Sequence, residues 1–456
     1  MRIFLLIATL FLTSLVDAKE VTDLTLIPPG KITDKVDLDI RGGITNHSDV
    51  AVTYDIHIRI KGNGIDRTLV RQRKEIAGRQ SATISYNLET EGLTGRYTVI
   101  FTARKGLRTY REKRQTEIIP SDQRATGTID GAWIGLYHWS ETEGKHWNKD
   151  IRKLTAEDWK GVVRSMHEIG MDIIVVQEVF RNQLYAGKHD IDINSYEGLA
   201  FYPSELYPGR MDIACPDALE AIMDEADRLG MHVLPGIGMF AWFDFSKESL
   251  EWHKAVTEEI WKMYGHHSSF YGFYVSEEQF GSLDNGERTP EMQDYRKQEM
   301  VEFFKDYKQF CRLLAPSKPV MLATNSMQIT KAEDTYPELL QNLDILCPFG
   351  FARMPEGDLT GQEAAQMLQS WCDGAGSHLW FDLEAFLFNP DTSLYPRDID
   401  GIVSDLTMLD NFEKVLCYQY PGVFNNPEFH PLIGAPRSIR LYNDYRNYIN
   451  PVPETG

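Results

Sequence analysis

Long hydrophobic runs and cysteine are both scarce in this sequence. After the first 18 residues no apolar run reaches the roughly 18 residues that a membrane-spanning helix needs, which excludes a membrane protein with several spans. The five cysteines form no CxxC pair, so neither a disulfide framework nor a cysteine-rich zinc site is indicated. We expect buried free thiols at these positions: Cys215, Cys311, Cys347, Cys372 and Cys417.

Clustered positive charge and glycine-rich phosphate loops are also missing. The formal net charge is -20, and it is uneven: residues 19–125 carry 19 Lys and Arg against 14 Asp and Glu, whereas residues 126–456 carry 27 against 52. A surface this acidic repels a phosphate backbone, so we expect no nucleic-acid partner. No glycine-rich first turn precedes a helix, so we also expect no dinucleotide and no other cofactor.

The N-terminus has the pattern of a removable targeting segment. Arg2 precedes the apolar stretch 3–15, and Val16-Asp17-Ala18 offers a small-residue cleavage site. We therefore expect residues 1–18 to be a signal peptide and the mature protein to be periplasmic or secreted. No cysteine lies near the cleavage site, so we expect no lipid anchor after cleavage.

Two regions follow with different patterns. Residues 19–120 contain short stretches of alternating apolar and polar residues between glycine-containing breaks, which predicts a small antiparallel β-sandwich of the immunoglobulin-like kind. Residues 121–128 are polar and predict a linker. From 129 to 456, short apolar runs alternate with amphipathic stretches, which predicts an α/β fold, specifically a (β/α)8 TIM barrel that carries the catalytic site.

Eight strands are predicted for this barrel, and helices between most of them. The expected strands are 132–139, 172–178, 232–238, 271–277, 320–325, 344–349, 378–384 and 415–420. The expected helices are 156–169, 216–229, 250–264, 292–314, 361–371 and 398–409, with a closing helix over 438–449.

Carboxylates at the ends of the fourth and seventh strands are the sharpest candidates for catalysis, because active sites of TIM barrels form at the C-terminal ends of the strands. Strand alternation turns Tyr274, Ser276 and Glu278 toward the barrel interior, and it places Asp382 and Glu384 together on one face of their strand. Two such carboxyl groups across a cleft can divide the work of cleaving a glycosidic bond. We predict Glu278 and Glu384 as the catalytic pair, with Glu277 and Asp382 as reserves.

Aromatic and polar residues at the other strand ends predict a sugar ligand, because flat apolar sugar faces stack on aromatic rings while polar groups bind hydroxyls. All nine Trp lie in the predicted barrel. The predicted substrate-binding residues are His138, Trp139, Gln177, Glu178, Trp242, Asn325, Trp380 and Tyr418.

A metal site is not predicted. His138 stands alone where a metal-dependent barrel would have a His-x-His pair, and His266-His267 ends a predicted helix, where a capping role is favoured over ligation.

These motifs resemble those of a known group. Tyr271-Gly-Phe-Tyr-Val-Ser-Glu-Glu278 is similar to the strand-four motif of glycoside-hydrolase barrels, and His378-Leu-Trp-Phe-Asp-Leu-Glu-Ala-Phe386 is similar to their strand-seven segment. Residues from about 130 to 450 resemble an exported glycoside-hydrolase-like family of Gram-negative bacteria, the domain of unknown function DUF4434. The resemblance implies retaining hydrolysis with Glu278 as acid/base and Glu384 as nucleophile. The Asn that usually precedes the acid is Glu277 here.

The sequence thus predicts an exported glycoside hydrolase whose partner is a carbohydrate. Two alternatives stay open at this point. One is a carbohydrate-binding protein on a barrel that has lost catalysis, and the other is a polysaccharide lyase whose base is a Tyr or His near Tyr137-His138.

Overall fold

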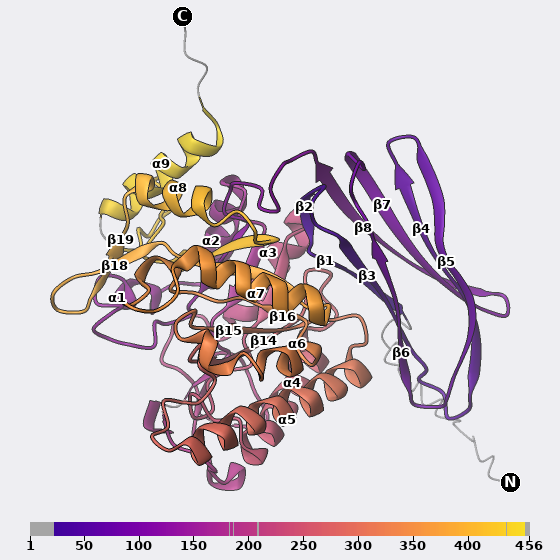
Figure 1. Ribbon diagram of the computed structural model, residues 1–456, viewed down its shortest axis with the longest axis horizontal. Helices are drawn as coiled ribbons and strands as arrows, with labels where there is room; N and C mark the ends of the chain where they lie inside the picture. The colour runs from indigo at the N-terminus through magenta and orange to yellow at the C-terminus, as the bar shows by residue number, and fades with distance from the viewer. Residues whose placement is uncertain (1–21, 182, 186, 208, 435, 452–456) are drawn as a thin grey trace, which may run out of the picture.

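The computed structural model describes residues 22–451 apart from 182, 186, 208 and 435, and it contains an N-terminal β-sandwich and a parallel barrel (Figure 1). The predicted targeting segment, residues 1–18, lies outside the described residues. None of the described helices combines the length and apolar character needed to cross a bilayer. All five cysteines are buried and unpaired, as predicted.

The sandwich consists of two sheets. Strands β1 (Thr22–Ile27), β3 (Leu38–Thr45) and β6 (Ser81–Leu88) form the first sheet. The second has the order β2 (Gly30–Thr33), β8 (Arg108–Ile119), β7 (Gly95–Lys105), β4 (Val52–Gly62) and β5 (Ile65–Ile76). In β4, Tyr54, Ile56 and Ile58 are buried while Asp55 and Arg59 are exposed, because alternate side chains point to opposite faces of a strand.

The barrel contains the eight parallel strands that the sequence predicts. Around the barrel they run β13 (His232–Pro235), β10 (Ile173–Val176), β9 (Gly131–Ile134), β20 (Lys414–Tyr418), β17 (His378–Glu384), β16 (Ile345–Leu346), β15 (Val320–Thr324) and β14 (Phe273–Gln279). Between β13 and β14 the pairing is reduced to isolated parallel bridges, Val233 with Phe270 and Gly236 with Tyr274. These bridges close the barrel, and this junction is its least continuous seam.

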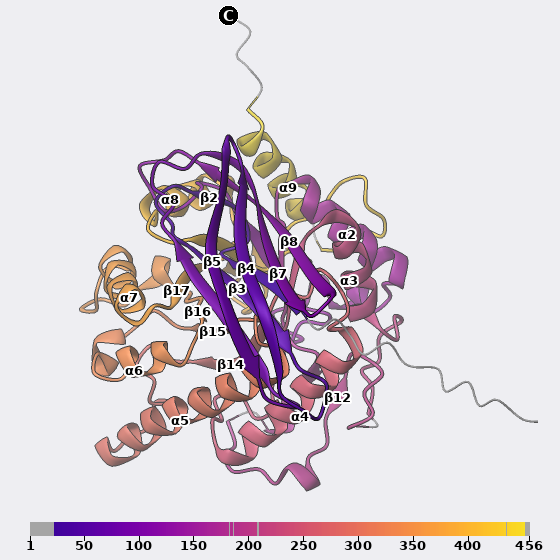
Figure 2. The same ribbon diagram turned by 90° about the vertical axis from the view of Figure 1, so that its right-hand side faces the viewer.

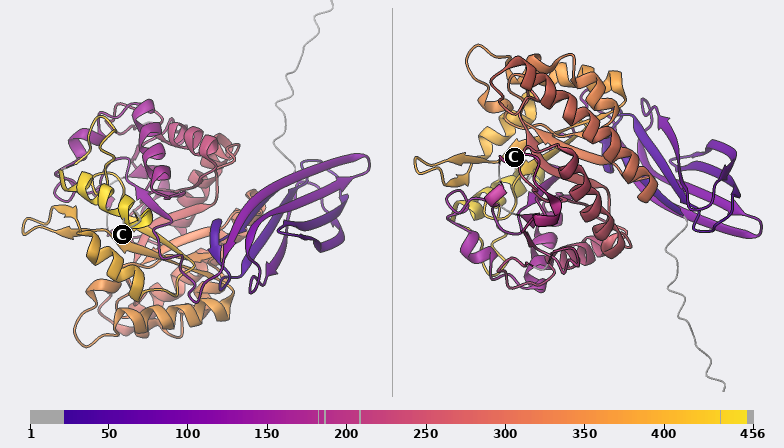
Figure 3. Two further views of the ribbon diagram at one scale, coloured as in Figure 1. Left: turned by 90° about the horizontal axis from the view of Figure 1, so that it is seen from above. Right: turned by 90° about the horizontal axis from the view of Figure 1, so that it is seen from below.

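Helices surround the strands (Figures 2 and 3). They are α2 (Ala156–Glu168), α3 (Ala218–Leu229), α4 (Lys247–Tyr264), α5 (Pro290–Leu314), α6 (Tyr336–Gln341), α7 (Gly361–Ala375), α8 (Ile399–Met408) and α9 (Pro436–Ile449), with the short α1 (Asn148–Ile151) before them. The sequence predicts all of the longer ones and misses α6, which is only 6 residues long.

Side chains inside the barrel form a core that is separate from the layer between strands and helices. Trp133, Tyr274 and Trp380 belong to the interior core, and the rings of Trp133 and Tyr274 meet edge to face at 5.9 Å between centroids. Phe273 and Val275 belong instead to the outer layer. The predicted alternation along β14 is therefore confirmed, and it turns the next inward position, Glu278, toward the upper end of the barrel.

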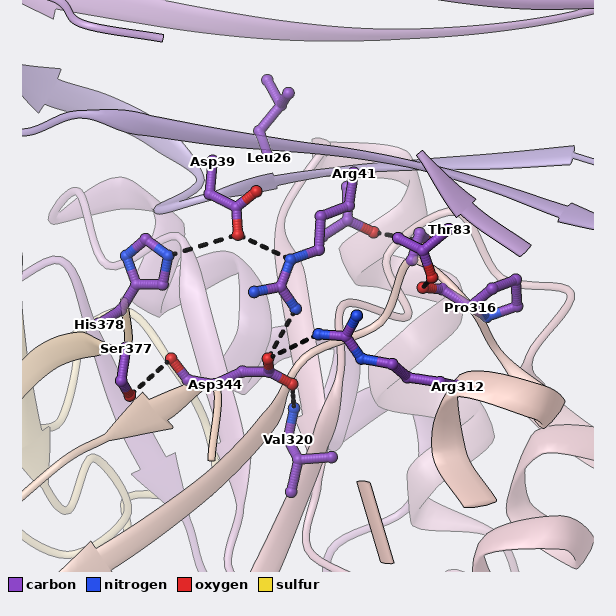
Figure 4. Close-up of polar contacts among 12 residues, drawn as sticks. Leu26, Asp39, Arg41, Thr83, Arg312, Pro316, Val320, Asp344, Ser377 and His378 are labelled. Atoms are coloured by element: carbon purple, nitrogen blue, oxygen red, sulfur yellow. Dashed lines mark hydrogen bonds and ion pairs between the residues drawn. The ribbon is translucent and has the colours of Figure 1, made fainter. Parts of the chain in front are cut away.

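The sandwich packs against the end of the barrel where the strands begin, through buried ion pairs (Figure 4). The Arg41 guanidinium on β3 lies 2.7 Å from Asp39 and 2.8 Å from Asp344, the residue that precedes β16. Asp344 also contacts Lys308 at 3.0 Å and Arg312 at 3.3 Å. These cations hold the pKa of the buried Asp344 carboxyl far below its usual range despite the opposing effect of burial.

The predicted linker, residues 121–128, makes contacts with the barrel domain. The Arg124 guanidinium pairs with Asp373 on α7, with both N–O distances 3.1 Å, and the Ala125 N–H donates to the Asp410 carbonyl. The sandwich and the connecting segment thus both contact the barrel. Their contacts lie on the side opposite the β18–β19 hairpin (Phe386–Phe388 and Leu394–Pro396) (Figure 1).

Candidate active site

A pocket of about 230 Å³ opens at the C-terminal ends of the barrel strands, remote from the sandwich. Four carboxyl side chains line it: Glu143, Glu278, Asp382 and Glu384. One cation, Arg353, and several apolar or aromatic side chains complete its wall: Trp139, Trp242, Phe349, Phe386, Phe388, Leu394 and Tyr418. Carboxyl groups gathered against apolar walls have raised pKa values, which is the condition for acid/base chemistry near neutral pH.

Glu278 projects into the pocket from the end of β14. Burial and the neighbouring carboxylates of Glu143 and Glu384 raise the pKa of Glu278 to about 7, against the opposing effects of Arg353 and Trp242. A carboxyl group with this pKa holds its proton in about half of the molecules at neutral pH. It can therefore act as a general acid and, once deprotonated, as a general base.

Glu384 projects from the end of β17 and is held by Arg353. The Arg353 Nε donates to both carboxylate oxygens of Glu384, at 2.8 and 3.1 Å, and the Glu384 side chain is 13% exposed. Burial raises the pKa of Glu384, and the Arg353 charge opposes that rise. From behind, Arg397 donates to the Glu384 carbonyl at 2.9 Å and pairs with Asp405 at 2.7 Å, which fixes the backbone of this strand end.

Asp382 lies on the same face of β17 as Glu384, two residues earlier and therefore deeper in the barrel. It is buried, and burial together with the charges of Glu384 and Glu278 raises its pKa well above the usual range. Its Oδ1 makes no hydrogen bond to any described residue. The surroundings of Asp382 thus favour its protonated form.

Glu143 comes from the loop between β9 and α1, and burial raises its pKa to about 7. The His138 ring lies behind it, with Nε2 at 3.6 Å from a Glu143 carboxylate oxygen. Burial lowers the pKa of His138 to about 4, so this imidazole is neutral at pH 7. Glu143 therefore adds a titrating carboxyl group beside Glu278 without a compensating imidazolium.

The loop after β13 places Trp242 against the pocket in a strained conformation. Trp242 and Phe243 both have positive backbone φ angles, +41° and +70°, in a region that residues other than glycine rarely adopt. Glu277 stabilises this loop from the outer side of β14: its carboxylate accepts the Phe240 N–H at 2.6 Å. Strained backbone of this kind persists where the surroundings hold it, and it concentrates at functional sites.

A family model describes this part of the chain. The model of a domain of unknown function, DUF4434, matches residues 129–431, which is more than half of the sequence. The chain belongs to the DUF4434 family. None of the curated proteins matches the sequence.

Solved structures resemble the DUF4434 domain in fold. A protein of Bacteroides thetaiotaomicron assigned as an alpha-L-fucosidase is 16% identical, with a TM-score of 0.50 over 71% of this chain and 93% of that one. A Bacteroides uniformis beta-glucuronidase is 12% identical, with a TM-score of 0.43 over 94% of this chain and 50% of that one. An Eisenbergiella tayi beta-galacturonidase is 12% identical, with a TM-score of 0.40, over 90% of this chain and 69% of that one, in its galacturonate complex. The likeness to the first of these structures shows a shared barrel fold.

The structure brings six of the predicted site residues of the DUF4434 domain to the pocket wall. They are Trp139, Trp242, Glu278, Asp382, Glu384 and Tyr418. His138 contributes from behind, through Glu143. Glu277 lies outside the pocket, because its side chain leaves the opposite face of β14 to bind the Trp242 loop.

The remaining predicted residues of the DUF4434 domain lie elsewhere. The Trp380 side chain is fully buried in the interior core and stacks on Tyr271, whose hydroxyl donates to Leu26 of the sandwich, so its predicted place near the catalytic face is wrong. Glu178 is buried and pairs with Arg181, which also donates to the Tyr137 and His138 carbonyls. Asn325 accepts the Met327 N–H at 2.8 Å within its own turn, and Gln177 is buried beside β9.

Glu143 and Arg353 are pocket residues that the sequence analysis misses. Glu143 lies in the loop after β9, and Arg353 ends a short 3-10 helix (Phe351–Arg353) several residues after β16. A signal for Arg353 exists in the sequence: it is a cation that follows the sixth predicted strand, 344–349.

Proposed function

We propose that this protein is an exported glycoside hydrolase that cleaves a carbohydrate with retention of configuration, with Glu278 as acid/base and Glu384 as nucleophile. The observation that carries the proposal is that Glu278 and Glu384 line one aromatic-walled pocket in different electrostatic surroundings. Glu278 has a pKa of about 7, whereas Glu384 accepts two hydrogen bonds from Arg353. Environments that differ in this way favour Glu278 as the acid/base and Glu384 as the nucleophile.

The two steps follow from these surroundings. In the first, protonated Glu278 gives its proton to the glycosidic oxygen while a Glu384 oxygen bonds to the anomeric carbon and the leaving group departs as an alcohol. In the second, ionised Glu278 takes a proton from water, the water oxygen bonds to the anomeric carbon, and the bond to Glu384 breaks. Glu278 ends protonated, as it began, and Glu384 ends ionised.

The aromatic wall supports a sugar as the ligand. Trp139 and Trp242 meet edge to face with 4.7 Å between ring centroids, and Trp242 stacks on Phe243 at 5.3 Å. Phe386 and Phe388 of the β18–β19 hairpin also line this pocket. Such rings bind the apolar face of a pyranose, while the carboxyl groups and the Tyr418 hydroxyl are available to its hydroxyl groups.

The lyase alternative finds less support. The Tyr137 hydroxyl hydrogen-bonds to Glu141 and accepts from Arg152 at 3.0 Å, and Tyr137 does not line the pocket. Burial raises its pKa and lowers that of His138. A tyrosine base needs a lowered pKa, which the surroundings of Tyr137 do not supply.

A panel of 4-nitrophenyl glycosides and oligosaccharides tests the proposal. The wild type should release nitrophenol from at least one of them, and Glu278→Gln should turn over the unactivated oligosaccharide at least about 10³-fold more slowly. Glu277→Gln is the matched control: the adjacent side chain lies outside the pocket, and the amide oxygen of Gln can still accept the Phe240 N–H, so this variant should stay within about tenfold of wild type. Oligosaccharide binding by all three proteins without any product would establish the binding-only alternative instead.

The pH profile of kcat/KM carries a second prediction. Because Glu278 must be protonated to act as acid, kcat/KM should fall as pH rises through about 7. Glu143→Gln removes a negative charge that raises the pKa of Glu278, so the alkaline limb should move to lower pH while kcat at the optimum changes less than about tenfold. An alkaline limb that stays in place in Glu143→Gln would mean that Glu278 is not the group that titrates.

A further inference from the structure

Three potential metal ligands converge where α3 meets the connection between α4 and β14. They are Glu220 on α3 and the consecutive residues His266 and His267, and one ligand atom from each lies within 4.8 Å of the others. His267 is buried, Glu220 is half-buried and His266 is exposed. No other group of this kind is found among residues 22–451 as far as they are described.

Both imidazoles are oriented by the nitrogen that faces away from this cluster. The Nδ1 of His267 lies 2.9 Å from an Asp227 oxygen, and the Nδ1 of His266 lies 2.9 Å from the Met263 carbonyl. An Nδ1–H that donates to these acceptors leaves each Nε2 with its lone pair. The Nε2 of His267 already lies 3.2 Å from the Glu220 carboxylate, and the two imidazole rings lie 4.2 Å apart.

Asp227 is itself fixed by its neighbours. Its second oxygen accepts the Ser269 N–H at 2.6 Å and the Ser268 hydroxyl at 3.0 Å. A ligating histidine whose other ring nitrogen donates to a carboxylate or a backbone carbonyl is the usual arrangement around protein-bound zinc. Here His267 faces the Asp227 carboxylate and His266 faces the Met263 carbonyl.

We propose that Glu220, His266 and His267 bind a divalent transition metal ion, with Zn²⁺ as the preferred ion. Two imidazole nitrogens and one carboxylate oxygen form a donor set that suits zinc, with water as the fourth ligand. Tetrahedral bonds of about 2.0–2.2 Å bring ligand atoms to within about 3.5 Å of one another. The exposed His266 and half-buried Glu220 side chains can close that distance toward the fixed His267.

The position of the cluster gives the ion a structural role. Glu220 and Asp227 belong to the helix that precedes β13, whereas His266 and His267 precede β14, so the ion would connect both sides of the seam where the barrel closes. The Val233 N–H of β13 donates to the Ser269 carbonyl at 2.7 Å, two residues after the proposed ligand His267. An ion at this place stabilises the seam where strand pairing is reduced to two isolated bridges, at the end of the barrel opposite the catalytic pocket.

Calorimetric titration of the full-length protein with Zn²⁺, after treatment with EDTA and dialysis, tests the site. One ion should bind per chain, and saturating Zn²⁺ should raise Tm by about 5 °C. His266→Ala removes an exposed ligand, so the variant should fold, bind Zn²⁺ at least about tenfold more weakly and lose most of the Tm rise. Asp227→Asn should weaken binding about 10–100-fold through the orientation of His267.

His189→Ala is the matched control. His189 also contacts carboxylates, Asp190 at 2.8 Å and Glu299 at 2.9 Å, but it lies outside the proposed site. This variant should bind Zn²⁺ as the wild type does. Absence of a bound ion in the wild type, or equal affinity in His266→Ala and wild type, would overturn the proposal. In either case the cluster would consist only of the His267–Glu220 ion pair with His266 beside it.

Discussion

Glu384→Gly is expected to lower kcat on a 2,4-dinitrophenyl glycoside by about 10⁴-fold or more, because the substitution removes the oxygen that bonds to the anomeric carbon in the proposed mechanism. The activated leaving group departs without help from an acid, so the loss reports on the nucleophile alone. Arg353 should remain in the pocket without its partner and thereby attract small anions. Sodium azide should consequently restore turnover by occupying the space that the carboxylate leaves, and the glycosyl azide should have the opposite anomeric configuration to the substrate.

The same treatment of Glu278→Ala gives the contrasting result. On the dinitrophenyl substrate this variant should form the glycosyl-enzyme readily and release it slowly, since only the second step needs the base. Azide should accelerate that step and yield a glycosyl azide with the configuration of the substrate. Glycosyl azides of the same configuration from both variants, or no azide product from Glu384→Gly, would contradict the assigned roles.

Asp344→Asn is expected to destabilise the protein by about 3–5 kcal/mol, because it removes a buried carboxylate that three cations share, of which Arg41 is itself buried. Arg41 would keep only Asp39, and Lys308 and Arg312 would lose the carboxylate that they share. The pKa of Asp344 is strongly depressed, so its contribution to stability is present at neutral pH and is lost as pH falls through the acid range. Guanidinium denaturation followed by circular dichroism measures the effect.

Asp373→Asn is the control for this prediction. Asp373 also pairs with an arginine of the connecting segment, but its side chain is 50% exposed, and exposed ion pairs contribute about 0–1 kcal/mol. Equal denaturation midpoints for Asp344→Asn and Asp373→Asn would show that the buried network does not hold the sandwich to the barrel.

The fold follows from the sequence to a large extent, because strands and helices of the barrel differ in period and length. All eight strands are found where apolar runs predict them, and the longer helices lie between them. Helix α6 is missed because its 6 residues give less than two turns of amphipathic pattern. The ion pair between Arg41 and Asp344, which joins the sandwich to the barrel, cannot be predicted from the pattern of apolar and polar residues, since the two residues are far apart in the chain.

The candidate site is predicted less completely, for a reason that concerns geometry. Strand alternation assigns the side of the sheet correctly for Glu278, Asp382 and Glu384, which all line the pocket. Alternation does not give the depth along the strand, and so Trp380 is predicted to bind substrate although it packs in the core beside Tyr271. Loop residues such as Glu143 have no period at all, so only the folded chain brings them to the pocket.

Mass spectrometry of a trapped intermediate tests the central claim most directly. The protein is incubated with the 2-deoxy-2-fluoroglycosyl fluoride of the sugar that the panel identifies, and the digest is sequenced. The proposed mechanism predicts one fluorosugar per chain on the peptide that spans β17, attached to Glu384. Attachment to Asp382 or to another residue, or complete turnover with inverted configuration and no adduct, would contradict it.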